Sequence, residues 1–464
     1  MSERSRSVDI FLQIAQLAGG VASNPTGKNF LMQQPGDIPW TTRRFGENMS
    51  VISELRMQPA RTTVRSWNPG INTRLGITVL VSFTLLVGAN LATPLYPQLQ
   101  QDLALGAMGT TIAFASYVCS LMFFLYIVGH WSDHIGRRAA LVLAIIVSLV
   151  GTISFGSASS LWELCLGRGL QGAGVALATG ASAAALRELL PHKPEWASRF
   201  TLLASSGGVA FGPVLGGVLA LLPGGRNTVF TVQAILLLAT LIPLVALKAR
   251  PAIAMAERGD RHRALAPRRL GIPAEARAKF WMGALVGFLS FAVFGFALSL
   301  APGYFAQVFD LELLPVIGLI AGLPLGVSAL SQVVIRGGKY LLPVGLVILA
   351  ASTIGLVIAA ELGSLWSAIV ALALIGLGQG MAFRTAFSGA VNAVSASLHA
   401  QTVSTIYLVT YLGSALPVIA LGWAVGVYGQ ELSILVFSIL CALLALVLTC
   451  WSITSLVRER KISA

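Results

Sequence analysis

The most constraining feature of this 464-residue sequence is a series of long apolar runs that begins at Leu75 and continues almost to the C-terminus. A helix needs about 20 mostly apolar residues to cross the hydrocarbon core of a membrane. Runs of about this length occur twelve times, over approximately Leu75–Pro97, Met108–Val128, Ala139–Gly156, Leu161–Leu186, Phe200–Leu222, Thr228–Leu247, Phe280–Leu300, Leu314–Ile335, Leu341–Ala360, Leu365–Ala390, Val403–Gly426 and Leu432–Ile453. Charged residues are 11% of the chain, against about 25% in soluble domains. A soluble single-core globule is therefore excluded.

The pattern within the runs distinguishes helices from membrane strands. The strands of a membrane β-barrel alternate lipid-facing and lumen-facing residues, and these runs show no such alternation. We therefore predict an all-α integral membrane protein with twelve transmembrane helices.

The distribution of Lys and Arg predicts the orientation of the helices. With the N-terminus in the cytoplasm, 28 of the 31 Lys and Arg residues fall in the tails and inner joints, Arg168 and Arg384 lie within runs, and Arg226 alone lies outside. Cytoplasmic loops carry an excess of these residues. We predict cytoplasmic termini and a multi-pass plasma membrane protein, in bacteria an inner membrane protein. The net charge of +13 then reflects topology and contacts with membrane lipid, and no nucleic-acid partner is expected.

An internal repeat divides the runs into two groups of six. At an offset of 208 residues, Pro94 and Tyr96 recur as Pro302 and Tyr304, and Gln171-Gly172 recurs as Gln379-Gly380. Repetition at one offset indicates duplicated structural units, so we predict two pseudo-symmetric six-helix bundles. The predicted organisation is a tail over 1–74, a first bundle over 75–247, a basic cytoplasmic linker over 248–279, a second bundle over 280–455 and a cytoplasmic tail over 456–464.

The 74 residues before the first run have no counterpart at the repeat offset and no sustained apolar period. We expect this tail to be disordered and cytoplasmic. Met49 and Met57 are alternative translation starts, so the sequence leaves open whether residues 1–56 are translated.

The joint after the second run contains Gly129, Asp133, Gly136, Arg137 and Arg138. Glycine permits sharp turns, and Asp can pair with Arg or with a helix N-terminus. The segment closely resembles the signature between the second and third helices of the major facilitator superfamily. The resemblance implies a cytoplasmic gate that locks two halves together and yields as they rock.

A metal site is the alternative interpretation of the same joint. His130, Asp133 and His134 share one helical face, as metal ligands do. The glycines and arginines fit the gate and are not required by a metal, and the four cysteines lie in apolar stretches without companion histidines. We therefore expect no metal and no cofactor.

A second pattern lies in the fourth run, around Arg168, Gln171 and Gly172. An arginine inside a membrane helix is costly and faces a cavity or a partner. The stretch resembles a second pattern of the same superfamily, in which the resemblance implies a role in proton coupling or in binding an anionic substrate. The spacing of Gly167, Gly169 and Gly172 also fits a dinucleotide fingerprint, but that fingerprint requires a preceding strand.

A third pattern lies in the fifth run, at Gly208, Gly212, Pro213, Gly216 and Gly217. It is similar to a segment found mainly in superfamily members that exchange an internal solute for an external proton. Small residues let helices approach closely and proline bends a helix. Ordinary helix packing is the alternative, but the other two motifs favour the antiporter interpretation and thus export.

The first run departs from many drug exporters of this branch, because Gly88–Pro94 holds no carboxylate. Glu163, at the outer start of the fourth run, is the remaining membrane-level carboxylate outside the gate, and it is either a proton carrier or a solvated helix cap. With Arg168 and Arg384 uncompensated, the cavity is predicted to be neutral to positive, which favours neutral or anionic solutes.

Several polar side chains are candidates for lining the cavity. Arg384 either faces it or reaches the cytoplasmic headgroups. Tyr407 and Tyr411, one helical turn apart, are predicted to line it with Asn90, Gln171 and Gln379, and helix packing is the alternative.

The resemblance to the twelve-span drug/proton-antiporter-like branch implies a secondary active transporter that works by alternating access. We predict proton-linked export of a small organic solute or drug by a monomer. Uptake or facilitated transport of a sugar or organic acid is the alternative within transport, and a non-transporting membrane receptor or scaffold is the alternative of another class. No nucleophile, base and metal occur at one depth, so enzymatic activity is not expected, and the sequence does not name the solute.

Overall fold

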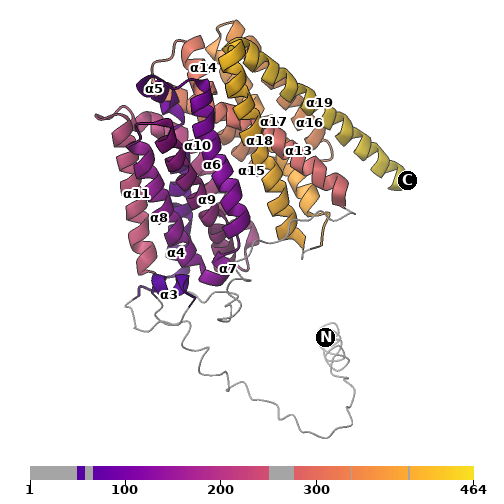
Figure 1. Ribbon diagram of the computed structural model, residues 1–464. Helices are drawn as coiled ribbons and strands as arrows, with labels where there is room; N and C mark the ends of the chain where they lie inside the picture. The colour runs from indigo at the N-terminus through magenta and orange to yellow at the C-terminus, as the bar shows by residue number, and fades with distance from the viewer. Residues whose placement is uncertain (1–49, 58–65, 250–275, 336, 396–397, 464) are drawn as a thin grey trace, which may run out of the picture. The chain divides into compact units, whose positions relative to one another are not determined.

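The computed structural model describes residues 50–57, 66–249, 276–335, 337–395 and 398–463. Within these ranges the chain is almost entirely helical (Figure 1). Twelve helical segments are long and apolar enough to cross a membrane, as the sequence predicted. Most of the expected tail and linker, residues 1–49, 58–65 and 250–275, lies outside the described residues.

The first half holds six of the twelve segments and several short helices. Its elements are α3 (Val51–Leu55), α4 (Ile71–Asn90), the 3-10 helix η1 (Thr93–Leu95), α5 (Tyr96–Asp102), α6 (Ala107–Val128), α7 (Ser132–Ile135), α8 (Arg137–Gly156), α9 (Leu161–Leu189), α10 (Pro194–Leu219) and α11 (Arg226–Ala246).

The second half repeats this order. Its elements are α13 (Arg277–Ser299), α14 (Ala301–Val308), α15 (Leu314–Val334), α16 (Leu341–Glu361), α17 (Leu365–Val391), α18 (His399–Tyr428) and α19 (Gln430–Ser463).

The internal repeat is visible where the first helix of each half breaks. The chain leaves α4 at Asn90 and turns through η1, which contains Pro94. In the second half, α13 gives way to α14, whose first turn contains Pro302. Proline has no N–H to donate and its ring clashes with the preceding turn, so it ends or bends a helix. The matched prolines therefore put matched breaks into the two halves.

Several helices extend beyond the apolar runs that predicted them. α4 begins at Ile71, α10 at Pro194 and α13 at Arg277, and α19 continues to Ser463. The tail expected over 456–464 is thus helical as far as Ser463. The expected disorder before residue 75 is also wrong for the described part, because α3 is a helix and Trp67 forms an isolated β-bridge with Leu247.

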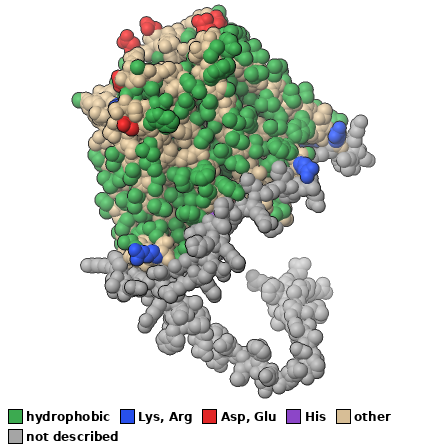
Figure 2. Space-filling model, in the orientation of Figure 1, with side chains coloured by type: hydrophobic (Ala, Val, Ile, Leu, Met, Phe, Trp, Pro, Cys, Tyr) green, Lys and Arg blue, Asp and Glu red, His purple; other side chains and the backbone are tan. Residues whose placement is uncertain are grey.

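The helix sides and the helix ends differ in chemistry. Large apolar side chains such as Ile153, Ile242 and Val447 are exposed on the helices. Figure 2 shows hydrophobic side chains over the sides of the bundle, Asp and Glu at the end that carries α14, and Lys and Arg near α3 and near the end of α19. An apolar surface of this kind fits a lipid environment.

The two halves pack together through α10 against α15 and through α6 against α18. One buried cluster draws residues from both halves, including Leu91 and Phe114 from the first and Leu298, Leu325 and Val418 from the second. α5 and α14 also meet, at the same end of the bundle (Figure 1). The halves are therefore closed at the α5 and α14 end.

Candidate functional site

The turn between α6 and α8 brings the first motif together. α6 is capped by Gly129, and Gly136 separates α7 from α8 with φ of 91°. This positive φ favours glycine because other residues meet steric strain there. Gly180 of α9 lies close to this turn, because a Cβ on Gly180 would lie 2.5 Å from the Gly129 carbonyl oxygen. Gly136 thus turns the chain, and Gly180 lets the chain pass close to α9.

Arg137 is the centre of an ion-pair network at this turn. Its Nη1 lies 2.6 Å from Asp133 Oδ1, and its Nε donates to Glu188 Oε1 of α9 at 2.9 Å. Nη1 also donates to Ser132 Oγ at 2.5 Å. Glu188 was not predicted, although it is the first carboxylate after the fourth apolar run, Leu161–Leu186. These ion pairs join α7, α8 and α9 of the first half.

Arg138 has a different set of partners from Arg137. Its side chain is buried, and its Nε and Nη2 each lie 2.8 Å from Glu54 Oε2. Nη1 donates to the carbonyl oxygen of Leu247, just after α11. Arg138 therefore joins α3, α8 and α11 in the interior of this end of the molecule.

Glu54, on α3, was not predicted as a site residue. Its side chain is 4% exposed, and Arg138 is the charged group that faces it. Burial raises the pKa of the Glu54 carboxyl from 4.5 to about 7, since desolvation outweighs the opposing effect of the Arg138 charge. No local signal marks Glu54, because its partner lies 84 residues further along the chain.

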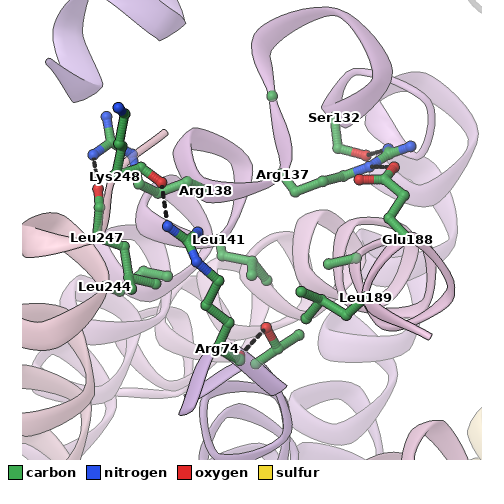
Figure 3. Close-up of a pocket in the computed structure, with 13 residues that line it drawn as sticks. Arg74, Ser132, Arg137, Arg138, Leu141, Glu188, Leu189, Leu244, Leu247 and Lys248 are labelled. Carbon is green, nitrogen blue, oxygen red and sulfur yellow. Dashed lines mark hydrogen bonds and ion pairs between the residues drawn. The ribbon is translucent and has the colours of Figure 1, made fainter. Parts of the chain in front are cut away.

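A pocket opens beside this network (Figure 3). Basic side chains dominate its polar lining: Arg74 from α4, Arg137 and Arg138 from α8, and Lys248 after α11. Glu188 adds one carboxylate to the lining. Arg74 is itself anchored, because its Nη2 donates to Lys248 O at 3.0 Å. The pocket is thus a basic recess of the first half.

The second motif lies inside the first half, around a fully buried arginine. Arg168 is 2% exposed and lies over the Tyr117 ring, 4.5 Å from its centroid. One Nη1 contact is to Ala89 O, and another is to Gln171 Oε1 at 3.0 Å. Among the described residues, no carboxylate forms an ion pair with Arg168.

Three polar atoms around Arg168 are buried without a hydrogen-bond partner. They are Arg168 Nε, Gln171 Nε2 and Tyr96 Oη. Buried polar groups are nearly always paired with protein or water, so this cluster has spare capacity for a polar ligand group or water. Gly172 lets α9 lie close to α6 beside this cluster, because a Cβ on Gly172 would overlap the Tyr117 carbonyl oxygen of α6.

Four other predicted residues form contacts within or between helices. Asn90 donates to Leu86 O at 3.0 Å on its own helix, and Gln379 accepts from Ser328 Oγ of α15. Arg384 donates to Ile335 O at 2.7 Å and so caps the C-terminus of α15. Glu163 is exposed in the first turn of α9 and accepts from Ser159 N at 2.7 Å. Of the two interpretations of Glu163, this geometry is that of a cap.

Tyr407 and Tyr411 belong to a group of half-buried aromatic rings in the second half. The two rings stack with centroids 6.0 Å apart, and Tyr411 meets Phe291 of α13 edge to face at 5.3 Å. Phe383 and Phe387 of α17 continue the group. Tyr411 also packs against the apolar cluster shared by both halves. The group therefore lies next to the junction of the halves.

The third motif lies on α10 and has two faces. Toward α4, the glycines approach backbone, and a Cβ on Gly212 would lie 2.7 Å from Val87 O and 2.8 Å from Asn90 Cβ. Gly208 and Gly216 continue this face against α4.

The opposite face of the third motif meets the second half. A Cβ on Gly217 would lie 2.7 Å from Leu314 C and from Pro315 Cα, at the start of α15. Pro213 lies inside α10, and its carbonyl oxygen is where a Cβ on Gly318 would fall. The motif therefore forms a close backbone contact between the halves.

Comparison with known proteins agrees with this architecture. A family model described as Major Facilitator Superfamily matches residues 78–417. The tetracycline resistance protein, class E, of Escherichia coli is 30% identical over 155 residues, which cover 32% of this chain and 37% of that protein. The multidrug resistance protein Stp of Mycobacterium tuberculosis is 31% identical over 152 residues, which cover 32% of this chain and 27% of that protein. The chain thus matches less than two fifths of the length of these relatives.

Solved structures are similar over most of the chain. A bacterial homolog to the human lysosomal transporter Spinster, in an inward-facing and unoccupied conformation, gives a TM-score of 0.69 at 15% identity, over 84% of this chain and 98% of that chain. The human organic anion transporter MFSD10 (TETRAN) gives 0.57 at 17% identity, over 82% of this chain and 100% of that chain. At these identities the likeness shows the fold.

Proposed function

Because the chain belongs to the major facilitator superfamily of transporters, we propose that it exports a small organic solute in exchange for protons by alternating access. The observation that carries the proposal is the contact of the Gly208–Gly217 segment of α10 with α15 of the other half. A segment whose backbone contacts both α4 of the first half and α15 of the second half is suited to an interface that must stay closed while the two halves change their relative orientation. The drug-resistance names of the relatives support the same direction of transport.

The conformation supports an alternating-access cycle. The halves meet at the α5 and α14 end, and the ion pairs of Arg137 with Asp133 and Glu188 lie within the first half. The basic side chains near α3 support a cytoplasmic location for the gate end (Figure 2). On this orientation, the contact of the halves at the α5 and α14 end supports an inward-facing conformation.

Arg168 supports a neutral or anionic solute. Its charge is buried without a paired carboxylate among the described residues, and Gln171 and Tyr96 offer further unpartnered polar atoms. A lipophilic cation would be repelled there, because like charges interact strongly in a medium of low dielectric constant. The aromatic rings of Tyr407, Tyr411 and their neighbours offer a complementary apolar face. We therefore propose a solute with an aromatic or apolar body and a neutral or negative polar group.

The proton carrier is proposed to be Asp133 or the solute itself. Glu163 is exposed and held as a helix cap by Ser159, which favours a structural role for this carboxylate. Asp133 lies in the gate and is paired with Arg137 in this conformation. An exchange of partners by Asp133 on closure would couple its protonation to the conformational cycle.

The test begins with accumulation of tetracycline and a panel of antibiotics and metabolites in cells with and without the protein. Solutes whose accumulation falls are then measured by counterflow in proteoliposomes, followed by transport under an imposed pH gradient. We expect counterflow without a gradient and directed transport with one. Counterflow without any response to the gradient would favour facilitated transport, gradient-driven uptake would favour import, and no transported solute would favour a receptor or scaffold.

A further inference from the structure

The short helix α3 is docked on the first half by both apolar and polar contacts. It begins after Ser50, whose Oγ accepts from Ser53 N at 3.2 Å. Val51 and Leu55 pack against a buried cluster that contains Ile135 and Leu141. A five-residue helix has little stability of its own, so these contacts and those of Glu54 hold it in place.

Glu54 is the polar centre of this docking. Its Oε2 receives both Nε and Nη2 of Arg138 at 2.8 Å. Its Oε1 faces the turn before α8, because a Cβ on Gly136 would lie 3.5 Å from that atom. Fully buried glutamates are rare unless paired, and here the partner is the second arginine of the Gly-Arg-Arg turn.

Arg138 also makes hydrogen bonds to the C-terminal end of α11. Nη1 donates to Leu247 O and, at 3.4 Å, to Val245 O. The segment after α3 reaches the same place independently, since Trp67 N donates to Ala246 O at 2.7 Å and Lys248 N donates to Trp67 O at 2.6 Å. Glu54 of α3 and Trp67, which both precede the first membrane helix, therefore both make hydrogen bonds at the gate end of the first half.

The two arginines of the gate turn thus have separate sets of carboxylates. Arg137 pairs with Asp133 and Glu188, whereas Arg138 pairs with Glu54. Neutralising Glu54 removes this ion pair from a buried arginine one residue away from Arg137, and moving toward Asp133 or Glu188 would lower the energy of Arg138. That movement would disturb the partners on which the gate depends.

We infer that Glu54 is a positioning residue of the gate: it holds Arg138 and the Gly136 turn in place, and with them the position from which Arg137 pairs with Asp133 and Glu188. This inference rests on the proposed transport function for its consequence but not for its geometry. α3 is on this view a working part of the gate, and neutralisation of its Glu54 carboxylate alters the cycle.

The experiment compares four full-length variants with the wild type: Glu54→Gln, Glu54→Asp, the double variant Glu54→Gln/Arg138→Gln, and Glu195→Gln. The last changes the same charge at an exposed position of α10 and serves as the control. Amide hydrogen exchange over residues 132–140 reports on the gate turn without any solute. Transport of a solute that the accumulation screen identifies gives Vmax and KM.

For Glu54→Gln we expect at least tenfold faster exchange at the gate turn and at least tenfold lower Vmax, with KM within twofold. Glu54→Asp is expected to lie between this variant and the wild type. In the double variant, amide exchange at the gate turn should recover to within about threefold of the wild type, because replacing both members of a buried pair removes the stranded charge. Glu195→Gln should match the wild type.

Unchanged exchange in Glu54→Gln would overturn the inference. Faster exchange with wild-type Vmax would also overturn it, because Glu54 would then only stabilise the fold. If no solute is transported even by the wild type, the proposed function fails, and the exchange of Glu54→Gln against the double variant still decides whether Glu54 positions the turn.

Discussion

The contact between α10 and α15 predicts that one methyl group at Gly318 shifts the conformational equilibrium of the protein. A Cβ at this position would overlap the Pro213 carbonyl oxygen, lie 2.8 Å from its carbon and lie 3.3 Å from Val214 Cα. Ordinary contacts between carbon atoms are about 3.5–4.0 Å, so the two helices would have to separate by about 1 Å. All three atoms belong to the backbone and cannot rotate away.

The magnitude follows from the cost of overpacking. Extra methyl groups in tightly packed sites cost about 1–3 kcal/mol, and this penalty applies only to the conformer in which α10 and α15 touch here. Gly318→Ala should therefore disfavour the conformer closed at the α5 and α14 end by about 5- to 150-fold. Alanine also favours helix over glycine by about 0.5–1 kcal/mol, but that effect is common to all conformers in which α15 is a helix.

The assay is the distance between spin labels at Gln101 on α5 and Gln307 on α14, two exposed positions, in a background without native cysteines. The wild type should show mainly short distances and Gly318→Ala mainly longer ones. The matched control is Gly326→Ala on the same helix, where a Cβ would lie 3.8 Å from Ala210 Cβ, an ordinary contact. If both variants give the wild-type distribution, or shift equally, the reasoning about backbone contact is wrong.

Further predictions concern the charged groups. Asp133→Asn should lower transport at least tenfold while membrane abundance stays at the wild-type level, because it removes a gate charge and no core packing; wild-type transport rates would remove the gate role. Arg168→Gln should abolish counterflow of an anionic solute more than that of a neutral one, which isotope counterflow measures. Glu163→Gln should keep gradient-driven transport, because this carboxylate is an exposed cap; loss of the gradient response alone would restore it as the proton carrier.

The membrane helices could be predicted from the sequence because each is a local feature of composition. A run of apolar residues must be helical to satisfy its backbone in lipid, so counting runs counts helices. The ends were less predictable. α10 starts six residues before the apolar run at Phe200, and α19 passes Ile453 to Ser463, because a helix continues beyond the hydrocarbon wherever its backbone bonds are still favourable.

The partners of the motif residues were predictable only where they are close in sequence. Asp133 and Arg137 are four residues apart, on either side of the Gly136 turn, and do form an ion pair. Glu188 and Glu54 reach the same turn from 51 and 84 residues away, and nothing in the local sequence distinguishes them from other glutamates. A disordered tail was expected before residue 75 because α3 is too short to produce a periodic pattern, although its Glu54 is among the most deeply buried charges of the described chain.

Polar residues inside apolar runs present the harder problem, because a sequence shows that they are polar but not what satisfies them. Asn90, Gln379 and Arg384 were all candidates for the cavity, and each has a helix backbone or hydroxyl partner. Arg168 and Gln171 come from the same kind of sequence but retain unpartnered buried atoms. Unused hydrogen-bonding capacity in a buried place is costly. Other buried atoms have it too, such as Gln233 Oε1, but at Arg168 it coincides with a buried charge that has no paired carboxylate among the described residues. For this reason we propose that the solute's polar group binds near Arg168, whereas the Arg137 ion pairs lie at the other end of α9.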